Sequence, residues 1–193
     1  MRILALTRYE RLGSSSRVRF YQYLPYLQTH GVEIVSAPFF SDQYVKDLYA
    51  GQAISRPYIL RAYIKRLFTL ANSASFDLLW VEKELFPWMP AWLEELLPVF
   101  KVPFVVDYDD AVFHRYDMHP SSLMRATLGR KIDRVMRSAA LVIAGNEYLC
   151  ERARQAGAKR VEYLPSVVDV DRYTLRQGSA SSDSPVRIGW VGS

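Results

Sequence analysis

The sequence predicts an α/β fold in which an open parallel sheet is covered by helices on both faces. Short β-like runs alternate along the chain with longer segments of helical periodicity. The β-like runs are apolar throughout rather than at every second residue, which is typical of parallel strands buried on both sides. Together these two observations indicate a Rossmann-like arrangement of successive β-α units.

Six strands are expected. Each is a short run rich in β-branched, aromatic or other apolar residues, and polar or turn-forming residues bound it. In chain order the expected strands are residues 2–7 (RILALT), 32–37 (VEIVSA), 76–83 (FDLLWVEK), 102–108 (VPFVVDY), 140–145 (ALVIAG) and 160–165 (RVEYLP).

Helices are expected between these strands. In residues 15–31 apolar side chains recur at helical spacing, and Gly31 is expected to end the helix in the left-handed conformation. Pro57 is tolerated because it falls in the first turn of its helix. The other expected helices are residues 42–51, 56–73, 90–100, 121–138 and 146–157, the last ending at Gly157.

The regular alternation ends at residues 174–185 (TLRQGSASSDSP). Their Ser, Gly, Asp and Pro content predicts a linker. Residues 186–193 (VRIGWVGS) then resemble a strand entering a turn, and a lone strand cannot bury itself. We therefore expect residues 1–173 to form one domain and residues 186–193 either to join its sheet or to begin a second domain.

The composition is that of a globular protein. Of the 193 residues, 50% are hydrophobic and 23% are charged, which suits one substantial core rather than a disordered chain. The amino-terminal apolar run is too short for a secretion signal, and no run approaches the ~20 residues of a membrane-spanning helix. We expect a cytoplasmic protein, with peripheral attachment to the inner face of the plasma membrane as an alternative.

Cysteine content and charge narrow the choice of partners. Cys150 is the single cysteine, so an internal disulfide framework is excluded, and its helical surroundings favour packing over reactivity. The net charge of +5 favours anionic partners such as phosphates or acidic lipids. The sequence does not indicate nucleic acid as a partner, and it does not set an oligomeric state.

Polar residues follow each of the expected strands. In an open parallel sheet, ligands bind in the crevice beyond the carboxyl ends of the strands, so these residues are candidates for one common site. They are residues 8–17 (RYERLGSSSR), Glu82 and Glu84, Asp107 to Asp110, Asn146 and Glu147, and Ser166 and Asp169.

The segment GSSSR, Gly13 to Arg17, has the character of an anion-binding turn. A glycine lets the backbone approach a ligand, and amides at a helix start favour negative charge, to which Arg17 and Arg19 add. The alternative is that a serine only caps the helix, and we expect a serine cap in either case. Because the G-x-G-x-x-G spacing is missing, the segment is weak evidence for a dinucleotide.

Three aspartates follow the fourth strand. Asp107 and Asp109 form an Asp-x-Asp sequence that can hold a divalent cation through oxygen ligands. Alternatively, Asp109 or Asp110 accepts hydrogen bonds from sugar hydroxyls, with a neighbouring pKa raised by like-charge repulsion. In a third interpretation Asp110 caps a turn and Asp107 is solvated or bound to backbone amides.

Two other features each have two interpretations. His114 either shuttles protons or pairs with a carboxylate for structural reasons. Residues 56–70 (RPYILRAYIKRLFTL) interleave cations with aromatic and aliphatic residues, which suits the surface of an anionic membrane. Alternatively, this helix packs an apolar stripe on the sheet and solvates the rest.

Five segments taken in order carry a resemblance to a known family. They are GSSSRVRFYQYLPYLQTHG, DLLWVEKELFPWMP, VVDYDDAVF, AALVIAGNEYLCERARQAGAKRVEYLPSVVDVDRY and VRIGWVGS. The series resembles the amino-terminal half of GT-B glycosyltransferases of the large retaining group often called group 1, or family 4-like. It covers nearly the whole chain, and the order of the segments carries the resemblance rather than any one motif.

The resemblance implies two Rossmann-like domains, the first holding the acceptor and the second the nucleotide-sugar. The chemistry would occur in the cleft between them, with the nucleotide-sugar as co-substrate and with no required metal or cofactor. Gly13 to Ser16 match the loop near the acceptor and the donor phosphates. Asp109 falls where many members have a histidine that touches the donor sugar, and Asn146 and Glu147 match the polar rim.

We therefore expect transfer of a sugar from a nucleotide-sugar to a hydroxyl of a glycan or lipid-linked acceptor, with retention. The donor-binding half is not found up to Ser193, so this chain is expected to be inactive alone. The alternatives are a non-catalytic module that binds a glycan or anionic ligand and a metal-dependent Asp-x-Asp transferase. The site candidates are Asp109 as the catalytic residue and Gly13, Ser14, Ser15, Ser16, Arg17, Glu84, Asp107, Asp110, His114, Asn146 and Glu147 as acceptor- or phosphate-binding residues.

Overall fold

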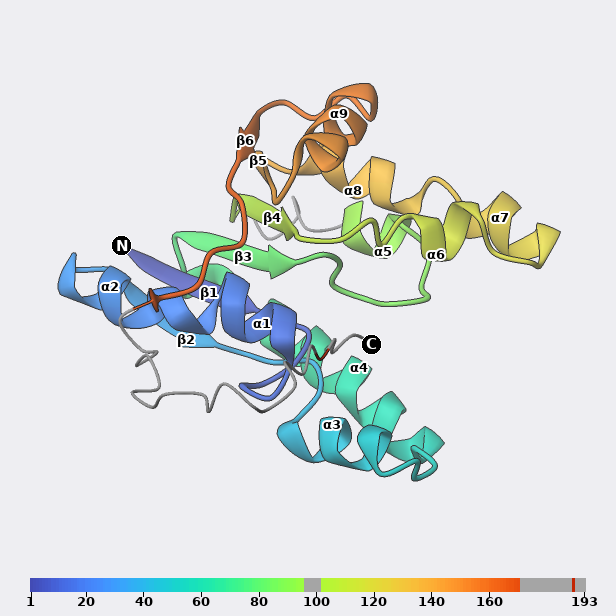
Figure 1. The fold of residues 1–193 in the computed structure, drawn as a ribbon, viewed down its shortest axis with the longest axis horizontal. Helices are drawn as coiled ribbons and strands as arrows, with labels where there is room; N and C mark the ends of the chain where they lie inside the picture. Colours follow the sequence, from blue (N-terminus) through green and yellow to red (C-terminus); the bar gives the residue numbers. More distant parts are fainter. Residues whose placement is uncertain (96–101, 171–188, 190–193) are drawn as a thin grey trace, which may run out of the picture.

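The sheet has six strands, all parallel, in the order β2-β1-β3-β4-β5-β6 (Figure 1). The structure, a computed structural model, describes residues 1–95, 102–170 and 189. The predicted α/β fold and its six strands are confirmed, each strand being shorter by one or two residues at one or both ends. The strands are β1 Arg2–Leu6, β2 Glu33–Ser36, β3 Leu78–Glu82, β4 Phe104–Tyr108, β5 Leu141–Ala144 and β6 Val161–Tyr163.

Helices link each of these strands to the next, as the β-α alternation predicts. Pro57 lies in the first turn of α4, and Gly31 and Gly157 adopt positive φ, as expected for residues that end helices. The helices are α1 Ser14–Arg19, η1 Tyr21–Tyr23, α2 Leu24–Thr29, α3 Asp42–Tyr49, α4 Arg56–Ala71, η2 Ser73–Ser75, α5 Trp92–Glu95, α6 His114–Asp117, α7 Ser122–Leu128, α8 Lys131–Ser138 and α9 Glu147–Gln155.

Two of the predicted helices are broken. The single helix expected over residues 15–31 is instead α1, η1 and α2, with Pro25 in the first turn of α2. Proline has no N–H to donate, so an uninterrupted helix cannot pass through it. The helix expected over residues 121–138 is divided into α7 and α8 at Gly129, whose helix propensity is low. The short helix α6 is not predicted by the sequence pattern.

Some predictions concern residues outside the described part of the chain. They are the second half of the helix expected over residues 90–100, the linker at residues 174–185, and the strand at residues 186–193 apart from Gly189. The domain boundary at residue 173 therefore stays a prediction. Among the described residues, no helix combines the length and the apolar character that crossing a bilayer requires.

One face of the sheet is covered by α1 and η1. Phe20 packs on Trp80 of β3 with 4.3 Å between ring centroids, and Arg19 forms an ion pair with Asp107 of β4. The chain that follows β6 runs back across this face, where the carbonyl of Leu164 accepts a hydrogen bond from Arg19 (Figure 1). Alternate residues along a strand point to opposite faces of the sheet. The strand residues next to Trp80 and Asp107 therefore point away from α1.

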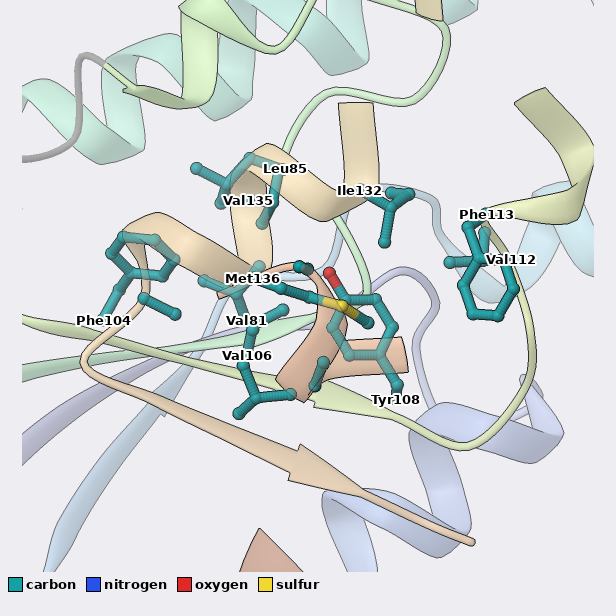
Figure 2. Close-up of a cluster of buried hydrophobic side chains, with 14 of the residues drawn as sticks. Val81, Leu85, Phe104, Val106, Tyr108, Val112, Phe113, Ile132, Val135 and Met136 are labelled. Carbon is teal, nitrogen blue, oxygen red and sulfur yellow. The ribbon is translucent and has the colours of Figure 1, made fainter. Parts of the chain in front are cut away.

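Those neighbours form the main core on the opposite face, against α4, α8 and α9. Tyr108 of β4, Met136 of α8 and Cys150 of α9 are all fully buried in it. This confirms the packing role expected for Cys150. Figure 2 shows the central part of this core, which includes Val81, Leu85, Phe104, Val106, Tyr108, Val112, Phe113, Ile132, Val135 and Met136.

The strand order places a topological switch point between β1 and β3. From β1 the chain moves outward to β2, and it then returns past β1 so that β3 pairs with the other side of β1, with Leu6 opposite Val81. At such a point the connections leave the carboxyl ends of two adjacent strands in opposite directions. The crevice that opens there is where doubly wound sheets bind ligands.

Candidate functional site

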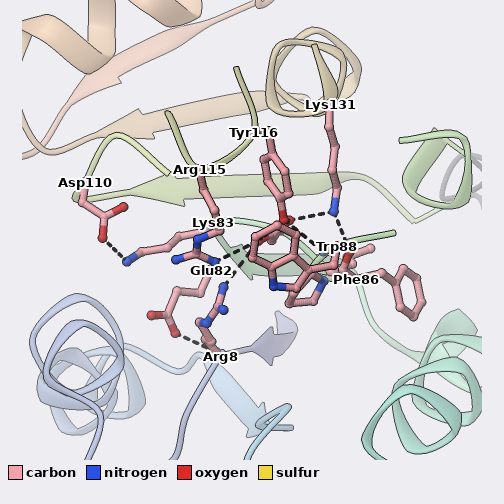
Figure 3. Close-up of polar contacts among 12 residues, drawn as sticks. Arg8, Glu82, Lys83, Phe86, Trp88, Asp110, Arg115, Tyr116 and Lys131 are labelled. Carbon is pink, nitrogen blue, oxygen red and sulfur yellow. Dashed lines mark hydrogen bonds and ion pairs between the residues drawn. The ribbon is translucent and has the colours of Figure 1, made fainter. Parts of the chain in front are cut away.

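Polar side chains from the loops after β1, β3 and β4 meet at the carboxyl edge of the sheet, beside this switch point. Lys83 Nζ lies 3.0 Å from Asp109 Oδ1 and 2.6 Å from Asp110 Oδ2. Ser15 Oγ donates to Asp109 Oδ2 at 2.5 Å and accepts from Lys83 Nζ at 3.3 Å. We call Ser15, Lys83, Asp109 and Asp110 the rim cluster; Figure 3 shows Lys83 reaching Asp110.

Lys83 reaches this cluster because the chain turns sharply after β3. Its φ of +62° is in the left-handed region, which residues other than glycine rarely adopt. Such strained residues are found most often at functional sites. Burial alone would lower the pKa of Lys83, but the carboxylates of Asp109 and Asp110 outweigh it and raise the pKa. Lys83 is therefore a fixed cation at neutral pH rather than a base.

Asp109 is held in the ionised form at this edge. Burial alone would raise the pKa of its carboxyl, but the charge of Lys83 and the hydrogen bond from Ser15 outweigh burial and lower the pKa. The side chain of Asp109 is 18% exposed, whereas that of Asp110 is 57% exposed. Asp109 Oδ1 is buried against Lys83, so a ligand can reach this preoriented acceptor only through the exposed remainder of its side chain.

A third carboxylate, Glu82, lies beneath the rim cluster at the end of β3. Its Oε2 accepts a hydrogen bond from Ser16 Oγ at 2.6 Å. It also accepts one from the backbone N–H of Arg8 at 2.7 Å, which Figure 3 shows. Its Oε1 is buried and has no hydrogen-bond partner among the described residues. Burial raises the pKa of Glu82 despite these hydrogen bonds. Glu82 therefore ties the loop after β1 to the end of β3.

Asp107 is part of β4 and points into the face covered by α1. Arg19 Nε and Nη2 both lie 2.8 Å from its Oδ1, and both side chains are almost fully buried. Burial raises the pKa of Asp107 to about 7, although Arg19 opposes this rise. Asp107 and Asp109 each already have a cation from the protein, Arg19 and Lys83. Within the described part of the chain, no group of three or more His, Cys, Asp or Glu side chains is suited to a metal ion.

The raised pKa of Asp107 predicts a loss of stability as the pH rises. The folded chain holds a proton on Asp107 up to about pH 7, whereas the unfolded chain releases it near pH ~4. Because the folded state binds more protons in this window, Asp107 should lower the free energy of unfolding by about 2 kcal/mol between pH 5 and pH 7. Urea unfolding at several pH values measures this.

Other buried groups also contribute to the pH profile, so the comparison uses Asp107→Asn. Burial raises the pKa of Glu82 as well, whereas the pKa of Asp109 is lowered by Lys83. Asparagine keeps the shape of the protonated carboxyl but cannot ionise, so the variant should lose the part of the decline that Asp107 causes. A variant whose profile is parallel to that of the natural chain would show that Asp107 does not titrate in this range.

Glu84 points inward, away from the rim cluster. Its Oε2 lies 2.6 Å from Lys131 Nζ and accepts a hydrogen bond from the hydroxyl of Tyr116 at 2.7 Å. Lys131 Nζ also lies 2.9 Å from Glu94 Oε1. It donates to the carbonyl of Phe86, as Figure 3 shows. Burial would raise the pKa of Glu84, but Lys131 outweighs it and lowers the pKa; at Glu94 burial prevails and the pKa is raised. We call Glu84, Glu94, Tyr116 and Lys131 the buried ion network.

The loop before α1 differs from its prediction in one respect. Gly13, not a serine, is the N-cap, and no side chain caps α1, so the expected serine cap is wrong. Ser15 and Ser16 turn their hydroxyls to Asp109 and Glu82 instead. A Cβ on Gly13 would lie 2.4 Å from the Cβ of Tyr9, so this position requires glycine. Ser14 and Arg17 are exposed, and Arg17 donates only to a backbone carbonyl.

Three other predicted residues make local contacts. His114 Nδ1 lies 2.9 Å from Asp117 Oδ1 and its Nε2 2.7 Å from the hydroxyl of Tyr148, which favours the structural interpretation of this histidine. Asn146 caps α9 by accepting from the N–H of Leu149, and Glu147 is exposed. No contact between Asn146 and the rim cluster is seen among the described residues.

The loop after β5 approaches the rim cluster through Gly145. A Cβ on Gly145 would lie 3.3 Å from both the Cα of Asp109 and the carbonyl oxygen of Tyr108. The small residue therefore lets the loops after β4 and β5 come together. As the rule for parallel sheets predicts, Ser15, Lys83, Asp109 and Gly145 share one edge.

Sequence reasoning missed Lys83, which links the two aspartates. The sequence pattern placed Lys83 at the end of the third strand. Only its two neighbours, Glu82 and Glu84, were named as site candidates. The signal was its place at the carboxyl end of a predicted strand, where a charged residue of either sign is a candidate. Arg8, which belongs to the predicted segment 8–17 after β1, is another cation at a strand end, and its Nη1 lies 3.4 Å from Glu84 Oε1.

Comparisons with known proteins do not assign a family. No protein-family model matches the chain, and a search of curated proteins gives no match.

Proposed function

We propose that this chain forms the acceptor side of a site that transfers a sugar from a nucleotide-sugar to a hydroxyl group, with retention of anomeric configuration. The rim cluster is the observation that supports this most, because Asp109 is a reachable, ionised acceptor at the edge where such sheets bind ligands. The ordered resemblance of five segments to GT-B glycosyltransferases supports the same class of reaction.

In this proposal Asp109 accepts hydrogen bonds from hydroxyls of the sugar at the reacting centre. Ser15 and Lys83 fix its orientation before the ligand arrives, so that little reorganisation is needed at the moment of reaction. Asp110, the most exposed carboxylate of the rim cluster, is a second acceptor for the sugar.

Asp107 and Asp109 each contact a cation of the protein, which favours this proposal over a metal-dependent Asp-x-Asp transferase. A shared metal ion would need oxygens from both Asp107 and Asp109. The carboxylate of Asp107, however, is buried against Arg19, and that of Asp109 is bound by Lys83 and Ser15. A metal ion would have to displace Arg19 and Lys83 from these two carboxyl groups, which would leave both buried cations without their partners.

The test is a transfer and hydrolysis assay of the full-length natural protein with a panel of nucleotide-sugars and glycan or lipid-linked acceptors. We expect turnover with at least one donor, and a product that keeps the donor's anomeric configuration. Binding of glycans or phosphates without turnover of any donor would overturn the proposal in favour of a non-catalytic module. Saturable Mn²⁺ binding that Asp107→Ala and Asp109→Ala abolish, with activity lost on chelation, would favour the metal-dependent alternative.

A further inference from the structure

Helix α4 exposes a row of large apolar side chains on the face that points away from the protein. Leu60, Ile64, Leu67 and Phe68 are 60, 44, 52 and 67% exposed. Their spacing of three and four residues places them on one side of the helix. We call these four residues the α4 outer face. Isolated exposed apolar residues are ordinary, but a contiguous row indicates a surface that another structure covers.

The opposite side of α4 already forms the contact with the rest of the protein. Ala62, Arg66 and Leu70 are buried there, and Arg66 donates a hydrogen bond to the carbonyl of Thr7. The α4 outer face is therefore not needed to attach the helix. Figure 1 shows α3 and the first turns of α4 projecting from the end of the sheet.

The charges beside this face indicate what covers it. Helix α4 contains no Asp or Glu, and Arg56, Arg61 and Lys65 are exposed on it. These three side chains have no hydrogen bond or ion pair within the described part of the chain. Unpaired cations beside an apolar helical face match an interface that combines hydrocarbon with negative charge, which an anionic lipid surface provides.

A recess beside α4 also favours an anionic lipid surface as the structure that covers the α4 outer face. Arg61 and Lys65 line a cavity of about 440 Å³ together with Ser41, Tyr58 and Glu10, among others. Glu10 is the one acidic residue in its lining, and its Oε2 already accepts a hydrogen bond from the N–H of Asp42. The recess thus offers two free cations to a phosphate headgroup next to the apolar face.

A second copy of this chain fits the α4 outer face less well. A two-fold contact brings the same surface of both copies together, so the cations beside the face would meet their own equivalents. Such like-charge pairs oppose association, whereas an anionic bilayer neutralises them. Helix α3 carries Asp42, Lys46 and Asp47, a net charge of −1, so it offsets only part of the positive charge of α4.

From these contacts we propose that the α4 outer face, with Arg56, Arg61 and Lys65, docks this protein on the surface of a bilayer that contains anionic lipid. The helix lies parallel to the membrane, with Leu67 and Phe68 inserted at the boundary between headgroups and acyl chains and the cations at the phosphates. This proposal does not depend on glycosyl transfer at the rim cluster.

Vesicle flotation tests the proposal, with phosphatidylcholine alone and with phosphatidylcholine mixed with phosphatidylglycerol. The chain should bind the mixed vesicles, and more weakly as salt is raised. The pair Arg61→Gln and Lys65→Gln should weaken binding roughly fivefold per cation. The pair Leu67→Ser and Phe68→Ser should weaken it by about tenfold or more, because the inserted apolar surface is lost.

Matched controls lie on other surfaces of the protein. Leu123 is 69% exposed on α7, and Lys159 is exposed in the turn after α9. Leu123→Ser and Lys159→Gln should bind vesicles as the natural chain does, and all variants should keep its free energy of unfolding because the sites are exposed. Equal binding to neutral vesicles, no binding to either kind, or no effect of the α4 variants would overturn the proposal. So would self-association that Phe68→Ser abolishes, which would assign the face to a second copy.

Discussion

Replacing Lys131 with methionine is expected to lower the free energy of unfolding by about 3–5 kcal/mol. The Lys131 side chain is 0% exposed, and its ammonium group is the cation shared by Glu84 and Glu94. Methionine fills a similar volume but leaves both carboxylates buried without that cation, and it leaves the carbonyl of Phe86 without its donor. For a chain of this size the melting temperature should fall by roughly 6–20 °C.

Urea and thermal unfolding measure this effect. Repeating them at several pH values distinguishes the loss of the buried cation from a simple loss of packing. Without Lys131, burial raises the pKa of Glu84 and of Glu94, so the variant's deficit should shrink as the pH falls and both carboxyls take up protons. Adding Glu84→Gln and Glu94→Gln should restore part of the loss. Lys159→Met, at an exposed lysine, is the matched control. A deficit below about 1 kcal/mol that is the same at all pH values would contradict the assigned role of the buried ion network.

Asp109→Ala is expected to lower kcat/KM for glycosyl transfer by about a hundredfold or more, equivalent to about 3 kcal/mol of transition-state stabilisation. This follows from the proposed function, in which Asp109 accepts hydrogen bonds from the reacting sugar. The carboxylate is preoriented by Ser15 and Lys83, and such groups contribute most when charge or hydrogen-bonding changes in the transition state. Steady-state kinetics of the full-length natural protein measure the loss.

Two additional variants separate catalysis from folding. Lys83→Met removes the cation that holds Asp109 but leaves the acceptor in place, so we expect a smaller loss in kcat and a pH profile shifted upward, because the pKa of Asp109 rises without Lys83. Glu151→Ala, at an exposed carboxylate on α9, should leave the kinetics unchanged. If Asp109→Ala retained more than about half of the activity while folded, Asp109 would have no catalytic role.

The order of the elements could be predicted because its signals are local. Short apolar runs rich in β-branched residues, such as those around Leu79 and Val106, favour buried strands. Gly31 and Gly157 end helices in a left-handed conformation that glycine adopts readily. The break at Pro25 was also visible in the sequence, but the apolar spacing on both sides of it favoured one continuous helix. There the tertiary packing of Phe20 on Trp80 sets the direction of the chain.

The position of the candidate site could be predicted from the sequence, but which of its side chains contact one another could not. The rule for parallel sheets places Ser15, Asp109 and Asn146 on one edge, since each follows a strand. The inward direction of Glu84 depends on Lys131, which is distant in sequence, and the reach of Lys83 depends on a positive φ that its residue type does not predict. Such features arise from contacts between distant segments, and propensities do not report them.

The pairing of β1 with β3 has a consequence for how the protein is made. Ile3 lies opposite Leu78 in the register, so 75 residues (78 − 3) separate two directly paired positions in the middle of the sheet. During synthesis one edge of β1 therefore has no native partner until the segment around residue 80 has left the ribosome. An open strand edge of this kind invites pairing with other chains, so the growing polypeptide depends on rapid collapse or on chaperones until β3 arrives.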